Sequence, residues 1–365
     1  MTETLTHQGA DATTRAGAWL AEFADALAGR DVDRAASMFA TESFWRDLVS
    51  FTWNLTTVEG PDGVGDLLRH TLHTTDPTRF AVTGEPTETD GVVEAWFTFE
   101  TATGRGTGHV RLVEEDGAAR AFTLLTTLDE LKGHEEALRR ERPKGVAHGA
   151  DPDRETWAEG REREAVELGY TRDPEVVVIG GGQGGIALAA RLRQLGVETI
   201  VVERNARPGD SWRRRYKSLA LHDPVWYDHL PYIPFPDNWP VFAPKDKIGD
   251  WLEMYTRVME INYWGSTTAD RATFDGTADD GRGRWTLEVT RSRDRDDGRA
   301  EGPEAVTLRP RQLVFALGVS GKPNIPVFPG QERFRGEIQH SSQHPGPEGL
   351  EGRRLVVVGS NNSAH

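Results

Sequence analysis

The sequence EVVVIGGGQGG, residues 175–185, joins an apolar run to five closely spaced glycines. The apolar run predicts a buried strand, and IALAARLRQLG after the glycines has the apolar spacing of a helix. VETIVVER, residues 197–204, then predicts a second buried strand. Strand, turn, helix and strand in this order form a βαβ unit. We therefore expect an α/β Rossmann-type domain with a parallel sheet.

The glycines at 180, 182 and 185 fit the spacing GxGxxG, which is typical of a dinucleotide-binding turn. Gly180 allows the tight turn, Gly182 lets the backbone approach a pyrophosphate, and Gly185 lets the helix pack against the strand. Glu203 ends the second strand, where a carboxylate accepts hydrogen bonds from both ribose hydroxyls and repels a 2′-phosphate. This predicts FAD or NAD rather than NADP. The glycines of GRGTG, residues 104–108, have no helix after them, so we expect a hairpin there.

Length and composition limit the alternatives. The chain has 365 residues, 37% of them apolar, which is enough for two or three domains. Its net charge of −15 argues against nucleic acid as a partner, and the lack of cysteine excludes disulfides and thiolate chemistry. The N-terminus does not resemble a signal peptide, and no apolar run approaches the roughly 20 residues of a membrane span. We expect a soluble cytoplasmic protein.

The first part of the chain has a different pattern. We expect a disordered tail at 1–14, because apolar residues begin to recur at helical spacing only after it. GVVEAWFTFE, residues 91–100, alternates as a strand, and two more strands are predicted at HVRLV and AFTLLTTL. Helices followed by a curled antiparallel sheet predict a compact α+β domain over 15–135. The charge-rich segment 136–172 is interpreted as a helical linker.

The dinucleotide domain is expected to cover residues 173–352. Within it, RWTLEVT and EAVTLRP predict a small antiparallel insertion, and RQLVFALG at 311–318 predicts a return to the sheet as a buried strand. LVVVG at 355–359 again resembles a buried strand that leads into a nucleotide-binding turn. Residues 353–365 are thus expected to begin a second dinucleotide domain.

Five ordered motifs resemble the flavin-containing monooxygenases, the class B flavoprotein monooxygenases, and in particular their bacterial and plant auxin-type members. The first four are ERNARPGDSWRRRY (203–216), LALHDPVWYDHLPYIPFP (219–236), FALGVSGKPNIPVFPG (315–330) and FRGEIQHSSQH (334–344). The fifth, VGSNNSA (358–364), resembles the family's NADPH-binding turn. The match departs from the family at Asp210, Leu317, His344 and Asn361. Residues 15–135 more loosely resemble the SnoaL-like cone fold of nuclear transport factor relatives.

The resemblance implies an enzyme that uses FAD, NADPH and dioxygen to oxygenate the nitrogen, sulfur or carbonyl group of a small-molecule substrate, with a homodimer as a candidate assembly. It implies a second Rossmann domain that is only begun, so the chain is interpreted as truncated and unable to turn over NADPH. The alternative is a non-catalytic flavin- or ligand-binding scaffold. The implied cofactor-binding residues are Gly180, Gly181, Gly182, Gln183, Gly184, Gly185, Glu203, Ser211, Trp212, Gly359, Ser360, Asn362 and Ser363.

Several further side chains allow two interpretations. His222 stands where the family has an asparagine near the flavin, so it is the candidate catalytic residue, but it could also be a loop histidine bonded to Asp223. His340 belongs to a family fingerprint and is expected to shape the junction between nucleotide domains. Trp45 and Asp47 could open a pocket in the first domain, although core packing is the simpler expectation. The remaining candidates are a weak metal pair, His70 and His73, and the expected core or pocket-wall residues Trp226, Trp239, Trp251 and Trp264.

Overall fold

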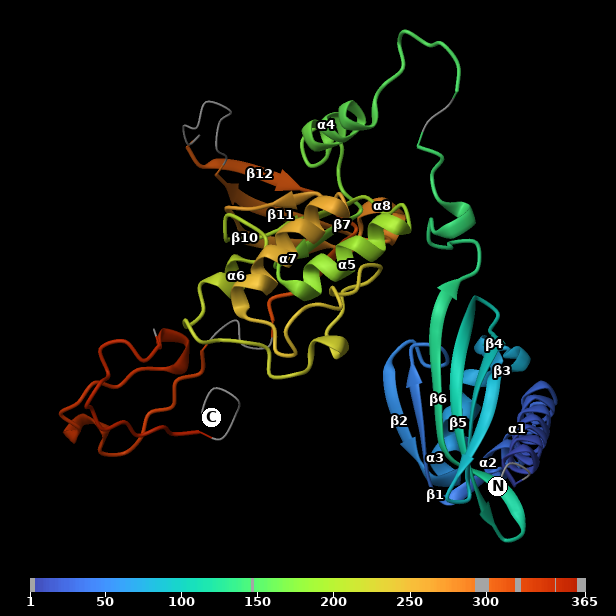
Figure 1. The fold of residues 1–365 in the computed structure, drawn as a ribbon. Helices are drawn as coiled ribbons and strands as arrows, with labels where there is room; N and C mark the ends of the chain where they lie inside the picture. Colours follow the sequence, from blue (N-terminus) through green and yellow to red (C-terminus); the bar gives the residue numbers. More distant parts are fainter. Residues whose placement is uncertain (1–3, 146–147, 293–301, 319–322, 345, 360–365) are drawn as a thin grey trace. The chain divides into compact units, whose positions relative to one another are not determined.

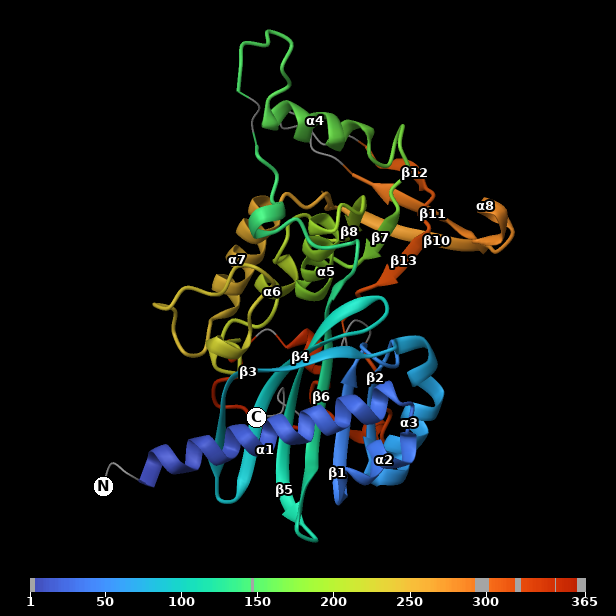
Figure 2. The same cartoon turned by 90° about the vertical axis from the view of Figure 1, so that its right-hand side faces the viewer.

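A computed structural model describes residues 4–145, 148–292, 302–318, 323–344 and 346–359. The chain divides into two compact units, Met1–Glu135 and Glu136–His365. Figures 1 and 2 show the elements of both units, and each unit is described by itself.

The first unit is a six-stranded sheet with three helices. The strand order is β2-β1-β6-β5-β4-β3, and Figure 2 shows helix α1 lying across the sheet. The pair β1 and β6 is parallel and the other pairs are antiparallel, so the predicted antiparallel sheet is in fact mixed. The elements are α1 (Thr4–Ala28), α2 (Val32–Ser37), β1 (Phe39–Leu48), β2 (Leu55–Glu59), α3 (Gly60–Thr75), β3 (Thr78–Thr89), β4 (Val92–Glu100), β5 (Gly104–Glu115) and β6 (Ala118–Leu131).

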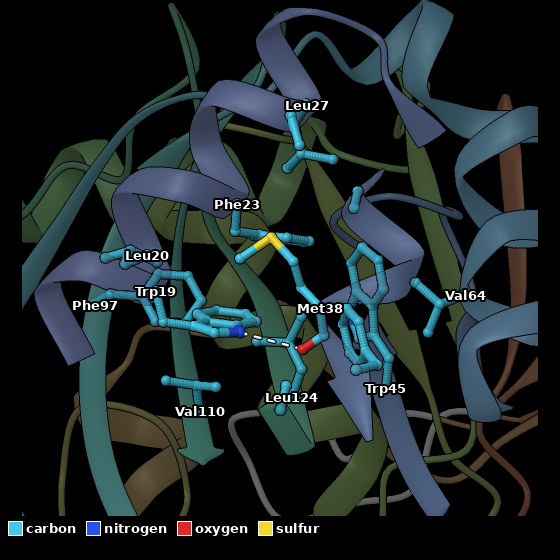
Figure 3. Close-up of a cluster of buried hydrophobic side chains, with 14 of the residues drawn as sticks. Trp19, Leu20, Phe23, Leu27, Met38, Trp45, Val64, Phe97, Val110 and Leu124 are labelled. Atoms are coloured by element: carbon cyan, nitrogen blue, oxygen red, sulfur yellow. Dashed lines mark hydrogen bonds between the residues drawn. The ribbon is translucent and has the colours of Figure 1, made fainter. Parts of the chain in front are cut away.

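Aliphatic and aromatic side chains together fill the core between the helices and the sheet (Figure 3). Phe23 of α1 packs edge-on against Trp45, with 6.1 Å between the ring centroids. Trp19 stacks on Phe23 at 5.0 Å and donates a hydrogen bond to the carbonyl oxygen of Met38 at 3.2 Å. The alternation predicted for β4 is confirmed, because Val93, Ala95, Phe97 and Phe99 are all buried. This unit therefore has a continuous core of its own.

Two further predictions for the first unit were wrong. Helix α1 begins at Thr4, so residues 4–14 are helical rather than a disordered tail, and Ala12 and Ala16 are buried at helical spacing. The glycines of residues 104–108 lie inside strand β5 and do not form a hairpin turn. A Cβ on Gly108 would lie 2.1 Å from the ring of Phe97, so glycine leaves room for the aromatic residues of β4.

The second unit contains a parallel sheet in the order β13-β7-β8-β9 and an antiparallel sheet in the order β10-β11-β12. All three pairs of the first sheet are parallel, which confirms the predicted βαβ unit β7-α5-β8. The unit is thus a mixed α/β structure with a Rossmann-like sheet. Its strands are β7 (Val176–Ile179), β8 (Thr199–Val202), β9 (Tyr263–Trp264), β10 (Thr267–Asp275), β11 (Arg284–Arg291), β12 (Glu304–Leu308) and β13 (Gln312–Phe315).

Helix α5 packs on strands β7 and β8 of the parallel sheet, and α7 packs against α5 and α6. Helix α5 runs from Gln183 to Gln194 and buries Ile186, Ala189 and Ala190. The remaining helices are α4 (Trp157–Glu167), α6 (Asp210–Arg213), α7 (Lys245–Val258) and α8 (Ala278–Gly281), with 3-10 turns η1 (Arg139–Glu141), η2 (Val225–Tyr227), η3 (Gln331–Arg333) and η4 (Ser341–Gln343). Among the described residues of the segment predicted as a helical linker, only those of η1 and α4 are helical, because the charged residues offer few apolar side chains to bury.

The apolar runs near the end of the chain differ from expectation. Strand β13 forms as predicted, but it is an edge strand and Phe315 is exposed rather than buried. Residues 355–358 form no strand and are exposed, Val356 by 85%. Within the described residues no strand pairs with them, and an isolated strand leaves its backbone groups without partners. Residues 293–301, within the charged stretch RSRDRDDGRAEGP between β11 and β12, lie outside the described residues.

Candidate functional site

The glycine turn lies at the carboxyl end of strand β7. Gly180 has φ +110°, and a Cβ there would lie 2.3 Å from the carbonyl oxygen of Ala316, which follows β13. A Cβ on Gly185 would lie 2.0 Å from the carbonyl oxygen of Gly180, so helix α5 approaches the strand too closely for any side chain. These two glycines are required by the fold itself.

Gly182 and Gly184 face open space instead. A Cβ on either would meet no atom within 4 Å, so the packing of the protein does not require glycine there. Gly182 is the N-cap of α5, and no side chain caps the helix. The first-turn N–H groups of a 12-residue helix thus lack a side-chain acceptor at a surface kept clear by glycine. This open cradle fits a phosphate group.

Glu203 directly follows strand β8 and faces the turn. Its Oε2 accepts a hydrogen bond from the Gly181 N–H at 2.7 Å. Its Oε1 accepts from the backbone N–H of Asn205 at 2.9 Å and from the Asn205 side-chain amide at 2.7 Å. The predicted carboxylate therefore lies beside the predicted turn, and Gly181 uses its N–H within the protein.

Tyr263 lies against the turn and was not predicted from the sequence. A Cβ on Gly181 would lie 2.4 Å from its hydroxyl, which donates a hydrogen bond to the Gly181 carbonyl oxygen at 3.3 Å. Burial, together with the carboxylates of Glu203 and Asp210, raises the pKa of Tyr263, so the hydroxyl stays protonated. The Gly181 peptide groups are thus held from both sides. No sequence pattern indicates this contact, because Tyr263 lies in a strand distant in the chain.

The GDSW segment also reaches the turn. The Trp212 indole N–H donates to Gln183 Oε1 at 3.2 Å, whereas Ser211 is exposed. Asp210 is buried and pairs with Arg213 at 3.0 Å. Burial raises the pKa of Asp210, but hydrogen bonds from Arg213 and from the backbone of Arg207 outweigh burial and lower the pKa below its ordinary value. Asp210 thus serves as the charged anchor of helix α6.

His222, the candidate catalytic residue, lies on an exposed loop, and its Nε2 lies 3.3 Å from Asp223 Oδ2. His340 caps η4 by accepting a hydrogen bond from the Ser342 N–H. Gly359 is exposed outside any helix or strand. The other predicted residues of the second turn, Ser360, Asn362 and Ser363, lie outside the described residues.

The pocket suggested in the first unit is absent at Trp45 and Asp47. Both are fully buried, and the Trp45 indole N–H donates to the Thr126 hydroxyl at 2.9 Å. Asp47 accepts hydrogen bonds from the N–H groups of Phe51 and Thr52. Both residues therefore stabilise the core.

The structure assigns no ligand-binding role to the histidine pair or to the tryptophans named as candidates. His70 bonds to the carbonyl oxygen of Asp66, and the described side chains contain no metal-binding group of three or more His, Asp or Glu residues. Trp251 and Trp264 are buried as expected, but Trp226 is 56% exposed and so belongs to no core. No helix in the described ranges has the length and apolar character needed to cross a membrane.

Comparison with known proteins adds a family context. The profile described as flavin-binding monooxygenase-like matches residues 173–365. Indole-3-pyruvate monooxygenase YUCCA1 of Oryza sativa subsp. japonica is 34% identical over 200 residues, which are 54% of this chain and 45% of that protein. Probable indole-3-pyruvate monooxygenase YUCCA9 of Arabidopsis thaliana is 34% identical over 189 residues, 51% of this chain and 42% of the relative.

The matches thus span about half the length of these curated relatives. Among solved structures, a flavin-containing monooxygenase from Stenotrophomonas maltophilia has 25% identity and a TM-score of 0.40, covering 49% of this chain and 48% of that one.

Proposed function

Because the chain belongs to the flavin-binding monooxygenase-like family, we propose that its second unit binds FAD at the glycine turn and that the protein is an NADPH-dependent monooxygenase. The observation that carries this proposal is the cradle at Gly182 and Gly184, which the packing of the protein leaves open. The N-terminus of α5, which no side chain caps, supports this proposal, because the oxygens of a pyrophosphate would accept hydrogen bonds from the N–H groups of the first turn.

Different residues around the cradle are proposed to bind different parts of the cofactor. The N–H groups of Gln183 and Gly184, in the first turn of α5, are the proposed pyrophosphate donors. Glu203 is the proposed acceptor for the adenosine ribose, and its negative charge disfavours a 2′-phosphate. Trp212 holds the side chain of Gln183 and thereby fixes the mouth of the turn.

When bound, FAD would take up a hydride from NADPH and activate dioxygen. The role of this chain is then to bind and orient the cofactor and to exclude water from it. His222 remains a candidate for contact with the reacting atoms, because its exposed loop position leaves the imidazole accessible to a ligand. Its bond to Asp223 equally suits a loop histidine.

The substrate class follows from the relatives. YUCCA1 and YUCCA9 carry names that specify indole-3-pyruvate, an aromatic 2-oxo acid. We therefore propose a small organic substrate with a carbonyl group, and a nucleophilic nitrogen or sulfur as the second possibility. The first unit, with its six-stranded mixed sheet and three helices, is proposed to be a SnoaL-like cone domain.

Two measurements test the proposal. Titration of the protein into FAD should quench flavin fluorescence with saturation, whereas FMN, which lacks the adenosine ribose, should bind more weakly. Assaying the FAD-loaded protein for NADPH oxidation in the presence of dioxygen then separates the catalytic function from the non-catalytic alternative. Absence of saturable FAD binding would refute the cofactor site. FAD binding without NADPH oxidation would favour the non-catalytic flavin-binding alternative.

A further inference from the structure

The side chain of Asn205 lies between Glu203 and Arg214, outside the glycine fingerprint. Its amide nitrogen donates to Glu203 Oε1 at 2.7 Å, and its amide oxygen accepts from Arg214 Nη1 at 2.6 Å. A carboxylate only accepts and a guanidinium only donates, so this is the one amide orientation that satisfies both neighbours. Asn205 is only 8% exposed, which makes a lost partner costly.

The backbone on both sides of this amide is fixed. The Glu203 N–H donates to the Trp264 carbonyl oxygen at 2.9 Å, and the Glu203 carbonyl oxygen accepts from the Thr267 N–H at 2.9 Å. The Asn205 carbonyl oxygen accepts from the Ser266 N–H, also at 2.9 Å. These bonds fix the main chain of Glu203, but its side chain can still rotate. The orientation of the carboxylate therefore depends on its own hydrogen bonds.

The hydrogen bonds within the protein occupy most acceptor positions of the Glu203 carboxylate. An ionised carboxylate offers about four acceptor positions, two on each oxygen. The N–H and the amide of Asn205 occupy both positions of Oε1, and the Gly181 N–H occupies one position of Oε2. One position remains, on the oxygen beside the glycine turn. In this arrangement Glu203 offers one acceptor to a ribose rather than the two expected from the sequence.

We propose that Asn205 is a positioning residue for FAD, which holds the Glu203 carboxylate with Oε2 at the turn, and that Arg214 acts through Asn205. This inference rests on the proposed FAD site. It adds two residues that the GxGxxG pattern does not contain. Without the amide, Oε1 keeps only the Asn205 N–H and Oε2 keeps the Gly181 N–H, so the carboxylate is held less firmly toward the ribose.

The test compares FAD dissociation constants measured by fluorescence titration. Asn205→Leu removes both side-chain bonds and should raise the Kd about tenfold, equal to about 1.4 kcal/mol. Arg214→Met should raise it about threefold, with no further loss in the Asn205→Leu background, because Arg214 acts through the amide. Arg214 is exposed, so its replacement tests the proposal even if Asn205→Leu fails to fold. An Arg214→Met Kd equal to that of the wild type would then overturn it.

A selectivity measurement distinguishes positioning from general stability. ADP-ribose and 2′-phospho-ADP-ribose should compete with FAD, and the wild type should prefer ADP-ribose. This preference should shrink in Asn205→Leu, because a mobile carboxylate opposes the 2′-phosphate less well. An unchanged preference together with an unchanged FAD Kd would overturn the inference.

Asn262 offers a matched control. Its amide donates to Glu164 Oε1 at 2.7 Å and accepts from Arg161 Nη2 at 3.3 Å, and both partners belong to α4. Asn262→Leu should leave FAD affinity unchanged. Equal losses in the Asn205 and Asn262 variants would indicate a structural effect and overturn the inference. If the wild type itself fails to bind FAD, the proposed function is refuted and this inference with it.

Discussion

Replacing Gly182 by valine separates the effect on cofactor binding from the effect on folding. The backbone angles of Gly182, φ −79° and ψ −173°, are available to any residue. A Cβ there meets nothing within 4 Å, so the side chain fits the protein alone. Valine is a poorer helix N-cap than glycine, which should cost about 1 kcal/mol of stability. The variant should therefore fold.

The effect on FAD should be much larger. Glycine at this position allows the backbone to approach a pyrophosphate, and a branched side chain would occupy that space. Each hydrogen bond to a charged group contributes about 1.5–3 kcal/mol, so losing two removes about 3–6 kcal/mol. A loss of only 2.7 kcal/mol already raises the dissociation constant about 100-fold. We expect a Kd at least 100 times that of the wild type for Gly182→Val.

The assay is flavin fluorescence quenching, with the melting temperature measured in parallel. Gly302→Val is the matched control, because a Cβ on Gly302 also meets nothing within 4 Å in the same unit. The control should bind FAD like the wild type. A Gly182→Val protein that melts like the wild type and binds FAD within threefold of it would refute the assignment of the turn.

Three further outcomes are expected. Residues 1–135 expressed alone should melt in one cooperative transition, since the unit has its own core; a gradual, non-cooperative loss of signal would contradict this. Asp47→Ala should destabilise that fragment by about 3 kcal/mol in urea, because it leaves buried N–H groups unpaired, and a change below 1 kcal/mol would contradict the buried network. Burial raises the pKa of Glu164, but hydrogen bonds, including those from Arg193, lower it below the ordinary 4.5, so its stabilising contribution is present above pH 4.5 and is lost as the pH falls further. The free energy of unfolding of Glu164→Gln should accordingly change less than that of the wild type as the pH falls below 4.5. Equal changes in the two proteins would count against a stabilising Arg193–Glu164 ion pair.

The glycine turn could be predicted from the local sequence pattern. The spacing of Gly180, Gly182 and Gly185 and the carboxylate at Glu203 were identified from the sequence, and the structure brings them together. This works because the turn, helix and second strand are consecutive, so their geometry depends on short-range sterics. The same logic predicted the alternating burial of strand β4.

Predictions that depended on which other segment packs against a given stretch of sequence were less reliable. The apolar run at 355–358 has the composition of a buried strand, yet it is exposed in the structure. The glycines at 104–108 have the composition of a turn, yet they lie in a strand beneath aromatic rings. In both cases the outcome depends on which segment lies alongside, and composition does not contain that information.

By itself, the sequence determined the βαβ unit, the dinucleotide-type turn and the family resemblance, since each depends on residues close together in the chain. Only the tertiary structure decided that Tyr263 supports the Gly181 peptide, that Asn205 links Glu203 to Arg214, and that Trp45 lies in a core rather than a pocket. Tyr263 and Arg214 come from separate segments, and Trp45 bonds to Thr126 on the neighbouring strand β6, which is distant in the sequence. Hydrogen bonds and packing act over a few ångströms, so such contacts exist only once the chain has brought distant residues together.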